Sequence, residues 1–335
     1  PGSTDGAGTP VAVAGFYWMN QPIRPDGESG LEDPNQLRWQ GRTSRPNSID
    51  ELRERLRYFR SVESDRQADL ISSRPTDVYI ATYPKCGTTL LQQMVHTLRT
   101  RGDMSYDEIT AVVPWFESAW DMGIEPGAES PAPPRAFKTH RTAAELPQNG
   151  RFIHMTRDPL AVADSFYRFF SGWAFETGTI SLDEFATCMI LEGTKAGRYW
   201  DHLLSWWPRR EDANVLFLAY EDFLADPLQV IQQVADLVGI GLDPELSDIT
   251  LRNTSLEFMR RHYRQFDDHL LRRYRDPILG LPSDGETFKV SLTNTRQQQL
   301  SASVQDLFAQ RWQETIGRQL GIPDYMSLRK QLTTA

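Results

Sequence analysis

Apolar and polar positions alternate in blocks along the chain, and these blocks predict strands and helices in turn. Runs rich in β-branched and aromatic residues, typical of buried strands, lie at 78–82, 135–139, 151–156 and 214–218. Helical patterns separate these runs, and the first pattern places apolar side chains on one face at Leu91, Met94, Val95 and Leu98. Strands that alternate with helices predict an α/β fold, a single domain with a central parallel sheet flanked by helices.

Two of the predicted helices have clear starting signals. Asp158-Pro159 follows the third predicted strand, and Asp226-Pro227 follows the fourth strand and its exit loop. Because Asp is a favourable N-cap and Pro is favoured at the first helical position, we expect helices at about 159–170 and 227–238. A further helix is expected over 49–58.

The ends of the chain are less regular. Residues 1–48 are rich in Gly, Pro, Asp and Asn and predict an irregular extension, whose aromatic island at 15–19 either folds over a pocket as a lid or anchors the extension. Residues 267–295 lack a clear period and predict a loop. A long helix is expected over 296–317. Its predicted buried stripe is Leu300, Val304, Leu307, Phe308 and Ile316.

Length and composition limit the class of protein. The 335 residues suffice for one large domain, assigned to 49–335. The net charge is −9 and no run of Lys or Arg could follow a nucleic-acid backbone, so we expect no nucleic-acid partner. No apolar stretch reaches the ~18 residues of a membrane span, and no leader peptide is visible. With only Cys86 and Cys188, and no metal-ligand spacing among six histidines, a cytoplasmic protein without a metal site is expected.

The segment from Thr82 to Leu90 carries the strongest chemical signal. It reads TYPKCGTTL and lies between a predicted strand and the start of a predicted helix. The first N–H groups of a helix lack partners within it, and the helix dipole favours an anion there. Gly87 lets the backbone approach a ligand, and Lys85 adds a positive charge. Thr88 and Thr89 add hydroxyl donors, so the segment predicts a phosphate-binding loop.

The position of the lysine separates this loop from the common nucleotide-triphosphate loop, in which Lys follows the last Gly. Here the order is Tyr83-Pro84-Lys85-Cys86-Gly87-Thr88-Thr89, which resembles the 5′-phosphosulfate loop of the soluble sulfotransferases. That family takes a sulfuryl group from 3′-phosphoadenosine 5′-phosphosulfate (PAPS) and leaves 3′-phosphoadenosine 5′-phosphate (PAP). The resemblance implies a P-loop-type domain. It also implies that the 5′ end of the donor is held by Lys85, Cys86, Gly87, Thr88 and Thr89.

Two further motifs extend the resemblance. The segment PRAFKTHRT, residues 134–142, resembles a family motif whose histidine is the general base and whose lysine contacts the sulfuryl group. It implies these roles for His140 and Lys138, and a neutral imidazole can indeed accept a proton at physiological pH. Arg157 and Ser165 have the spacing of the family's 3′-phosphate motif, and arginine binds phosphate oxygens bidentately.

Two weaker matches complete the predicted site. Tyr220 ends a strand in a Tyr-Glu-Asp segment and Thr254 lies in an Asn-Thr-Ser segment, and both resemble family segments near the adenine. In the predicted mechanism His140 takes the proton of an acceptor hydroxyl. Lys85 and Lys138 then offset charge at the transferring group, so that no metal is required.

Three departures from the family pattern matter. Cys86 stands where many members have Ser, and Leu90 stands where many have Trp. The C-terminal Arg-Lys-Gly motif that completes the 3′-phosphate site is missing, and its candidate substitutes are Arg272, Arg273 and Arg275. The family's dimer motif would start at Lys289 but is largely altered, so the oligomeric state stays open.

Aromatic residues crowd the segments expected to line a pocket, which suits a small hydrophobic alcohol or phenol as acceptor. They are Trp115, Phe116, Trp120, Phe166, Phe169, Phe170, Trp173 and Phe175, and at least half are expected in the ordinary core. Two alternatives stay open. One is a small-molecule P-loop kinase, which the position of the lysine disfavours. The other is a non-catalytic protein that binds adenosine nucleotides, which the missing Arg-Lys-Gly motif favours.

Overall fold

The computed structural model describes residues 39, 41–125, 127–130, 132–287, 289–290 and 299–333. The aromatic island and most of the predicted N-terminal extension lie outside these residues. The division of the chain at residue 48 therefore stays a prediction.

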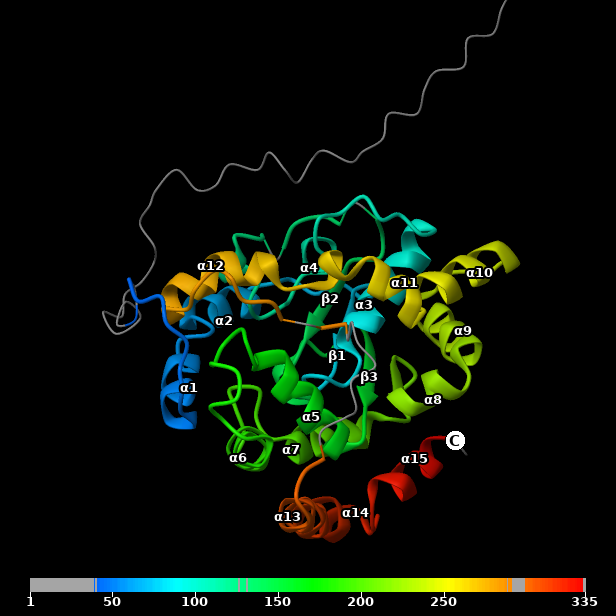
Figure 1. The fold of residues 1–335 in the computed structure, drawn as a ribbon. Helices are drawn as coiled ribbons and strands as arrows, with labels where there is room; N and C mark the ends of the chain where they lie inside the picture. Colours follow the sequence, from blue (N-terminus) through cyan, green and yellow to red (C-terminus); the bar gives the residue numbers. More distant parts are fainter. Residues whose placement is uncertain are drawn as a thin grey trace, which may run out of the picture.

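The four predicted strands are present and form one parallel sheet in the order β2-β1-β3-β4 (Figure 1). The strands are β1 (Val78–Ala81), β2 (Ala136–Thr139), β3 (Arg151–Thr156) and β4 (Val215–Ala219). In the register of the first pair, Ile80 of β1 lies beside Lys138 of β2. The predicted α/β class with a central parallel sheet is confirmed.

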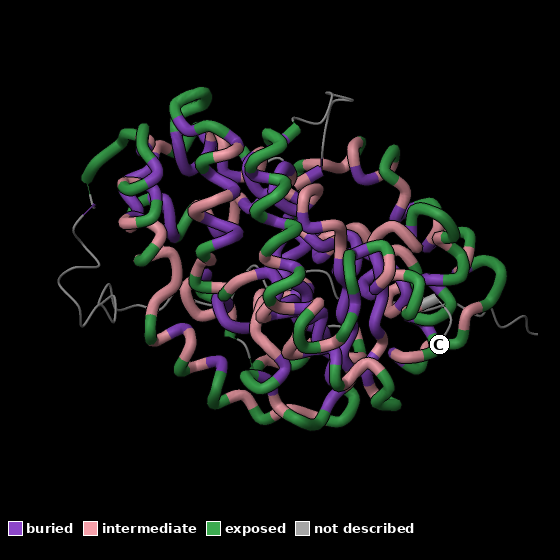
Figure 2. The backbone as a smooth tube through the Cα atoms, turned by 90° about the horizontal axis from the view of Figure 1, so that it is seen from below, coloured by how far each residue is buried: buried purple, intermediate pink, exposed green. Residues whose placement is uncertain are grey.

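Alternate residues of the strands face two hydrophobic cores, because successive side chains of a strand point to opposite faces. Tyr79 and Ala81 belong to one core, with apolar residues of α5 (Pro159–Phe170) and α7 (Tyr199–Trp206). Val78 and Ile80 belong to the other, with apolar residues of α3 (Thr88–Thr100) and α9 (Pro227–Val238). The strands are nearly continuously buried, as parallel strands covered on both faces must be. Figure 2 shows that buried segments run through the interior of the molecule.

Helices surround this sheet (Figure 1). Before β3 they are α1 (Ile49–Leu56), α2 (Val62–Asp69), α3 (Thr88–Thr100) and α4 (Ile109–Val112). Three helices lie between β3 and β4: α5 (Pro159–Phe170), α6 (Leu182–Ala186) and α7 (Tyr199–Trp206). The helix α8 (Tyr220–Ala225) directly follows β4. The remaining helices are α9 (Pro227–Val238), α10 (Pro244–Asn253), α11 (Leu256–Arg261), α12 (His269–Leu279), α13 (Ala302–Trp312), α14 (Arg318–Leu320) and α15 (Tyr325–Thr333). Within the described part of the chain, no helix combines the length and apolar composition needed to cross a bilayer.

The two Asp-Pro signals begin helices as predicted. Asp158 Oδ1 accepts hydrogen bonds from Leu160 N (2.8 Å) and Ala161 N (3.1 Å) at the start of α5. Asp226 Oδ1 accepts from Gln229 N (3.1 Å) at the start of α9. Both helices have the predicted bounds, because the cap fixes the first turn and the apolar stripe fixes the rest.

The predicted loop over 267–295 is wrong in its first half, where α12 forms. Its buried residues include Arg275 and Asp276 beside Leu271 and Leu279, so the buried face is partly charged and the apolar period is interrupted.

The C-terminal helix begins later than predicted. Residues 299–301 precede α13, which continues through a π-helical turn (Gln313–Gly317) into α14. Leu307 was predicted in the buried stripe and is 44% exposed, whereas Val304, Phe308 and Ile316 are buried as predicted. The helix packs on the core with a narrower apolar face than the sequence indicated.

Replacement of Arg273 by Pro tests whether α12 exists in solution. Arg273 is exposed in the helix interior, where Pro removes a hydrogen bond and clashes with the preceding turn at a cost of about 3 kcal/mol. We expect Arg273→Pro to lower the free energy of unfolding in urea by that amount, while Arg273→Ala changes it by less than about 0.5 kcal/mol. Equal stability of the two variants would indicate a loop.

Candidate active site

The loop between β1 and α3 has the form of an anion cradle. Lys85 and Gly87 take left-handed backbone conformations, with φ of 70° and 92°. Gly87 is the N-cap of α3 and no side chain caps the helix there, so its first N–H groups stay available to a ligand. A Cβ at Gly87 would lie 2.6 Å from Met155 Sδ and 3.1 Å from the Tyr220 ring, so a larger residue fits only if these side chains or the loop shift.

The three residues around Gly87 differ in how far they reach a ligand. Thr88 is buried and its Oγ1 lies 2.6 Å from Thr82 Oγ1, whereas Thr89 is half-buried; both line the cavity. Cys86 is fully buried, and burial raises the pKa of its thiol. Its N–H donates to Tyr83 O (3.2 Å), so Cys86 shapes the loop and supplies neither a free N–H nor a reactive thiolate.

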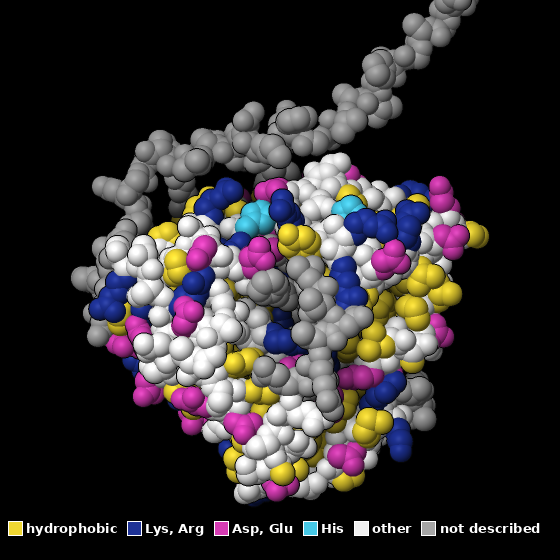
Figure 3. Space-filling model, in the orientation of Figure 1, with side chains coloured by type: hydrophobic (Ala, Val, Ile, Leu, Met, Phe, Trp, Pro, Cys, Tyr) yellow, Lys and Arg dark blue, Asp and Glu magenta, His cyan; other side chains and the backbone are white. Residues whose placement is uncertain are grey.

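A cavity of about 1220 Å³ opens beside this loop. Figure 3 shows Lys and Arg side chains inside a recess near the centre of one face. Four acidic side chains line the cavity, at Asp50, Glu54, Asp248 and Asp268. Ten basic ones line it, at Arg53, Arg57, Arg60, Lys85, Lys138, Arg157, Arg168, Lys195, Arg252 and Lys289. The cavity is thus strongly basic inside a chain whose net charge is −9, which suits a polyanionic ligand.

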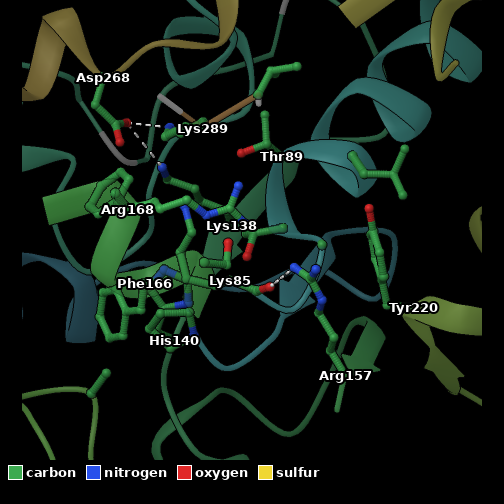
Figure 4. Close-up of a pocket in the computed structure, with 18 of the residues that line it drawn as sticks. Lys85, Thr89, Lys138, His140, Arg157, Phe166, Arg168, Tyr220, Asp268 and Lys289 are labelled. Atoms are coloured by element: carbon green, nitrogen blue, oxygen red, sulfur yellow. Dashed lines mark hydrogen bonds and ion pairs between the residues drawn. The ribbon is translucent and has the colours of Figure 1, made fainter. Parts of the chain in front are cut away.

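Both predicted lysines, Lys85 and Lys138, lie in this cavity (Figure 4), and each also lies over an aromatic ring. Lys85 Nζ is 4.1 Å from the centroid of the Phe169 ring, and Lys138 Nζ is 4.6 Å from the centroid of the Trp115 ring. Burial, followed by the charge of Lys289, lowers the pKa of Lys85 to about 7 and that of Lys138 to about 8. An anion bound beside them would reverse this shift.

His140 follows β2 and is held in one tautomer. Its Nδ1 lies 2.7 Å from the carbonyl oxygen of Thr82, which can only accept, so Nδ1 carries the proton. Its backbone N–H donates to Glu117 Oε1 (2.9 Å), and its ring meets Trp115 edge to face at 5.1 Å. Burial lowers the pKa of His140 to about 4, so at neutral pH the ring is uncharged and Nε2 is a free acceptor.

Arg157 follows β3 and stacks on Tyr220, the first residue after β4. Its Cζ is 4.5 Å from the centroid of the tyrosine ring, and its Nη1 donates to the carbonyl oxygen of Lys85 (3.2 Å). Among the described residues no carboxylate forms an ion pair with Arg157. The guanidinium is therefore held at the cavity wall with hydrogen-bonding capacity to spare.

The other predicted residues lie on helices around the same cavity. Ser165 lies on α5, and Thr254, at the end of α10, donates from Oγ1 to Thr250 O (2.7 Å). Leu90 and Leu256 line this part of the wall, which is consequently aliphatic. The structure thus brings together residues from four strand ends, as the sequence predicted.

The arginines proposed to replace the missing Arg-Lys-Gly motif do not reach the cavity. Arg272 pairs with Asp267, and Arg275 is buried against Asp121 and the carbonyl oxygen of Tyr58. Arg273 does not line the cavity either. Basic residues that the sequence did not single out for this role do line it, among them Arg168, Arg252 and Lys289.

The aromatic prediction separates into two groups. Trp115, Phe166, Phe169 and Phe170 line the cavity. Phe116, Trp173 and Phe175 are at most 1% exposed and belong to the core.

Comparison with known proteins decides the family. The sequence profile named Sulfotransferase domain matches residues 75–314, well over half of the chain. The chain belongs to the sulfotransferase family. It is accordingly a transferase that uses PAPS as the sulfuryl donor, and the open end of α3 beside Lys85 and Arg157 fits such an anion.

Curated relatives agree with this assignment. The chain is 34% identical to Sulfotransferase 1B1 of Canis lupus familiaris over 200 residues, which are 56% of this chain and 67% of the relative. It is 28% identical to Sulfotransferase 1E1 of Cavia porcellus over 280 residues, which are 77% of this chain and 95% of the relative.

Solved structures show the same fold. A mouse sulfotransferase, SULT7A1 complexed with PAP, aligns with a TM-score of 0.59 at 20% identity over 82% of this chain and 94% of that chain. Retinol dehydratase in complex with androsterone and PAP aligns with a TM-score of 0.54 at 20% identity, over 73% and 79%. The P-loop-type fold expected from the sequence is confirmed.

Alanine at Gly87 tests the cradle against a matched position. Gly87 and Gly178 both have positive φ, but only at Gly87 would a Cβ meet other atoms. We expect Gly87→Ala to destabilise the protein by about 1–3 kcal/mol more than Gly178→Ala, and to weaken PAP binding. Thermal unfolding with and without PAP measures both effects, and equal effects of the two variants would contradict the close packing of the loop.

Proposed function

We propose that this chain transfers the sulfuryl group of PAPS to a hydroxyl of a small hydrophobic acceptor, with His140 as the general base. The observation that carries the proposal is the state of His140. Its Nδ1–H is held by the Thr82 carbonyl, and its free Nε2 lies in the same cavity as Lys85, Lys138 and the open end of α3. A neutral, oriented imidazole is what proton abstraction requires.

The donor would lie across the strand ends. The N–H groups of Gly87, Thr88 and Thr89, with Lys85, hold its 5′ end at the start of α3, and Cys86 shapes the loop between them. Arg157 and Ser165 hold the 3′-phosphate. Tyr220 and Thr254 contact the adenine. Support for this placement is the common cavity that these residues line, with Lys138 and His140 at its other side.

The reaction follows from these positions. The acceptor O–H gives its proton to His140 Nε2 while its oxygen forms a bond to sulfur, and the bond from sulfur to the 5′-phosphate oxygen breaks. The electron pair of that bond leaves with PAP. Lys85, Lys138 and the dipole of α3 offset the charge that develops on the leaving phosphate and on the sulfuryl oxygens.

The acceptor side of the cavity favours a hydrophobic molecule. Its wall includes the side chain of Trp115, whose ring meets that of His140, and those of Phe59, Phe166, Phe169, Phe170 and Met189. Apolar walls with few polar groups suit an alcohol or phenol. Retinol dehydratase, which shares the fold, has been solved with retinol and with androsterone.

Transfer of ³⁵S from PAPS to a panel of phenols and alcohols tests the function, and His140→Ala tests the base. We expect the variant to lose about 10²–10⁴-fold in kcat while it binds PAP normally, because general-base catalysis is worth that much. His262→Ala is the matched control, since His262 does not line the cavity. Label transfer that survives in His140→Ala would remove His140 from the mechanism.

Protection from thermal unfolding shows which class of nucleotide the protein binds. PAP should raise the melting temperature of the wild-type protein, and ATP with Mg²⁺ should not. The converse result, with no label transfer to any acceptor, would favour a kinase. Protection by PAP without any transfer would favour a non-catalytic binding protein.

The affinity for PAP should fall as the pH rises from 7 to 9.5. The pKa values of Lys85 and Lys138 are about 7 and about 8 in the free protein, and a bound anion raises them, so binding takes up protons in this range. The ligand does not cause the change, because its phosphates have a second pKa of about 6 and only become more negative as the pH rises, which would strengthen binding. Calorimetry in buffers of different ionisation enthalpy measures the proton uptake.

The control for this pH dependence is Lys85→Arg. Arginine stays charged throughout the range, so part of the dependence should disappear. An affinity that is constant or rises with pH in the wild-type protein would contradict the lowered pKa values.

A further inference from the structure

A buried ion-pair cluster adjoins Lys138 in the same cavity (Figure 4). Asp268 forms an ion pair with Lys289, and its Oδ1 also lies 3.7 Å from Lys138 Nζ. The side chains of Asp268, Lys138 and Lys289 are only 2%, 4% and 7% exposed. Asp268 and Lys289 both line the cavity, although the family resemblance assigns neither of them a role there.

The side chain of Asp268 interacts with the lysines and does not cap the helix that it precedes. It occupies the N-cap of α12, yet its carboxylate accepts no hydrogen bond from that helix. Glu108 supplies this acceptor, because its Oε2 takes the N–H of Leu270 at 2.6 Å. Thr287 Oγ1 accepts the N–H of Asp268 (3.1 Å). An N-cap aspartate usually accepts a backbone N–H of the first helical turn, but Glu108 does so here. The carboxylate of Asp268 therefore interacts with the lysines of the cavity instead.

The cluster contains three lysines and three acidic side chains. The charged and titratable groups around Asp268 are Lys85, Lys138, Lys289, Glu108, Asp267 and His269. Asp267 already forms an ion pair with Arg272, and Glu108 already accepts the N–H of Leu270, so Asp268 is the carboxylate that the lysines share. Burial, then the charge of Asp268, raises the pKa of Glu108. Burial lowers the pKa of Lys289, but Asp268 and Glu108 outweigh it and the pKa lies above its usual value.

Buried charges of this kind are costly, and here two buried lysines share one buried carboxylate. An ion pair that only stabilises the fold needs one cation for one anion. A second lysine on the same carboxylate, at 3.7 Å, indicates a place where a further anion is expected.

We propose that Lys289 is a third lysine of the transfer site, which contacts the oxygens of the transferring sulfuryl group, and that Asp268 is the positioning residue that holds Lys289 and Lys138 there. The inference rests on the proposed function. The sulfuryl group carries three oxygens, and donors placed in advance around them stabilise the transition state without rearrangement. Asp268 fixes two flexible lysine side chains before the donor binds and so lowers the entropic cost of their ordering.

Steady-state kinetics and PAP binding of Lys289→Met test whether Lys289 contacts the transferring sulfuryl group. We expect kcat to fall about 10²-fold, the effect of losing one such donor, whereas the Kd for PAP changes less than about threefold because PAP lacks the sulfuryl group. Lys289→Arg should recover part of kcat. Arg272→Met is the matched control, because Arg272 forms an ion pair with Asp267 in the same segment but does not line the cavity.

The pH profile of Asp268→Asn tests whether Asp268 positions Lys138 and Lys289. Without the carboxylate the pKa values of Lys138 and Lys289 fall, so activity should be lost at lower pH on the alkaline side than in the wild-type enzyme. A structural role alone would lower activity equally at all pH values. An unshifted alkaline limb would therefore overturn the role of Asp268.

The outcomes separate this inference from the proposed function. Absence of ³⁵S transfer by the wild-type enzyme would reject the function itself. Wild-type transfer with full kcat in Lys289→Met would reject the inference alone. If Lys289→Met does not fold, the Asp268→Asn profile decides. If both variants unfold and Arg272→Met does not, the ion pair is a brace only and the inference is overturned.

Discussion

Burying a lysine costs free energy unless an anion lies close to it, and the cavity of this sulfotransferase brings Lys85, Lys138 and Lys289 together near the carboxylate of Asp268. The aromatic faces of Phe169 and Trp115 relieve only part of this cost. The pKa values of Lys85 and Lys138 accordingly lie below their usual range. An anionic donor beside the lysines offsets the same cost, so donor binding and catalysis draw on one arrangement of charge.

The order of the strands arranges the site residues in a row along one edge of the sheet. In the sheet order β2-β1-β3-β4, β2 leads to His140, β1 to Lys85, β3 to Arg157 and β4 to Tyr220. Their carboxyl ends share one edge, where ligands of open α/β sheets bind. The proposed roles follow the same order, from proton acceptor through the 5′ end and the 3′-phosphate to the adenine. Neighbouring strands lie about 4.8 Å apart, so the sheet itself spaces the contacts to a nucleotide.

The parts of the fold that were predictable are those in which a local pattern decides the structure. The helices α5 and α9 were found with their bounds because an Asp-Pro pair and an apolar stripe agree. In α12 Arg275 and Asp276 lie on the buried face and pair with distant groups, so no window of sequence contains the reason for their burial. Leu307 was misplaced because helical period alone does not say how wide the packed face is.

The candidate site shows the same division. Residues in contiguous motifs, such as Lys138 and His140, could be named from the sequence because one strand end carries them. Asp268 and Lys289 meet only after α12 and the following segment have folded back on β2, and neither stands in a pattern of its own. Substitutes for the missing Arg-Lys-Gly motif were sought nearby in sequence, whereas the basic residues on the cavity wall come from distant elements such as α5 and α10.

The hydrogen bond from His140 Nδ1 to the Thr82 carbonyl has one more consequence. With Nδ1–H engaged there, Nε2 is the nitrogen through which the ring exchanges protons. In the proposed mechanism, the proton taken from an acceptor would therefore leave from the side of the ring that faces the cavity, where the sulfated product lies. The imidazole would return to its neutral form as the product departs, so that release of the product would close each catalytic cycle.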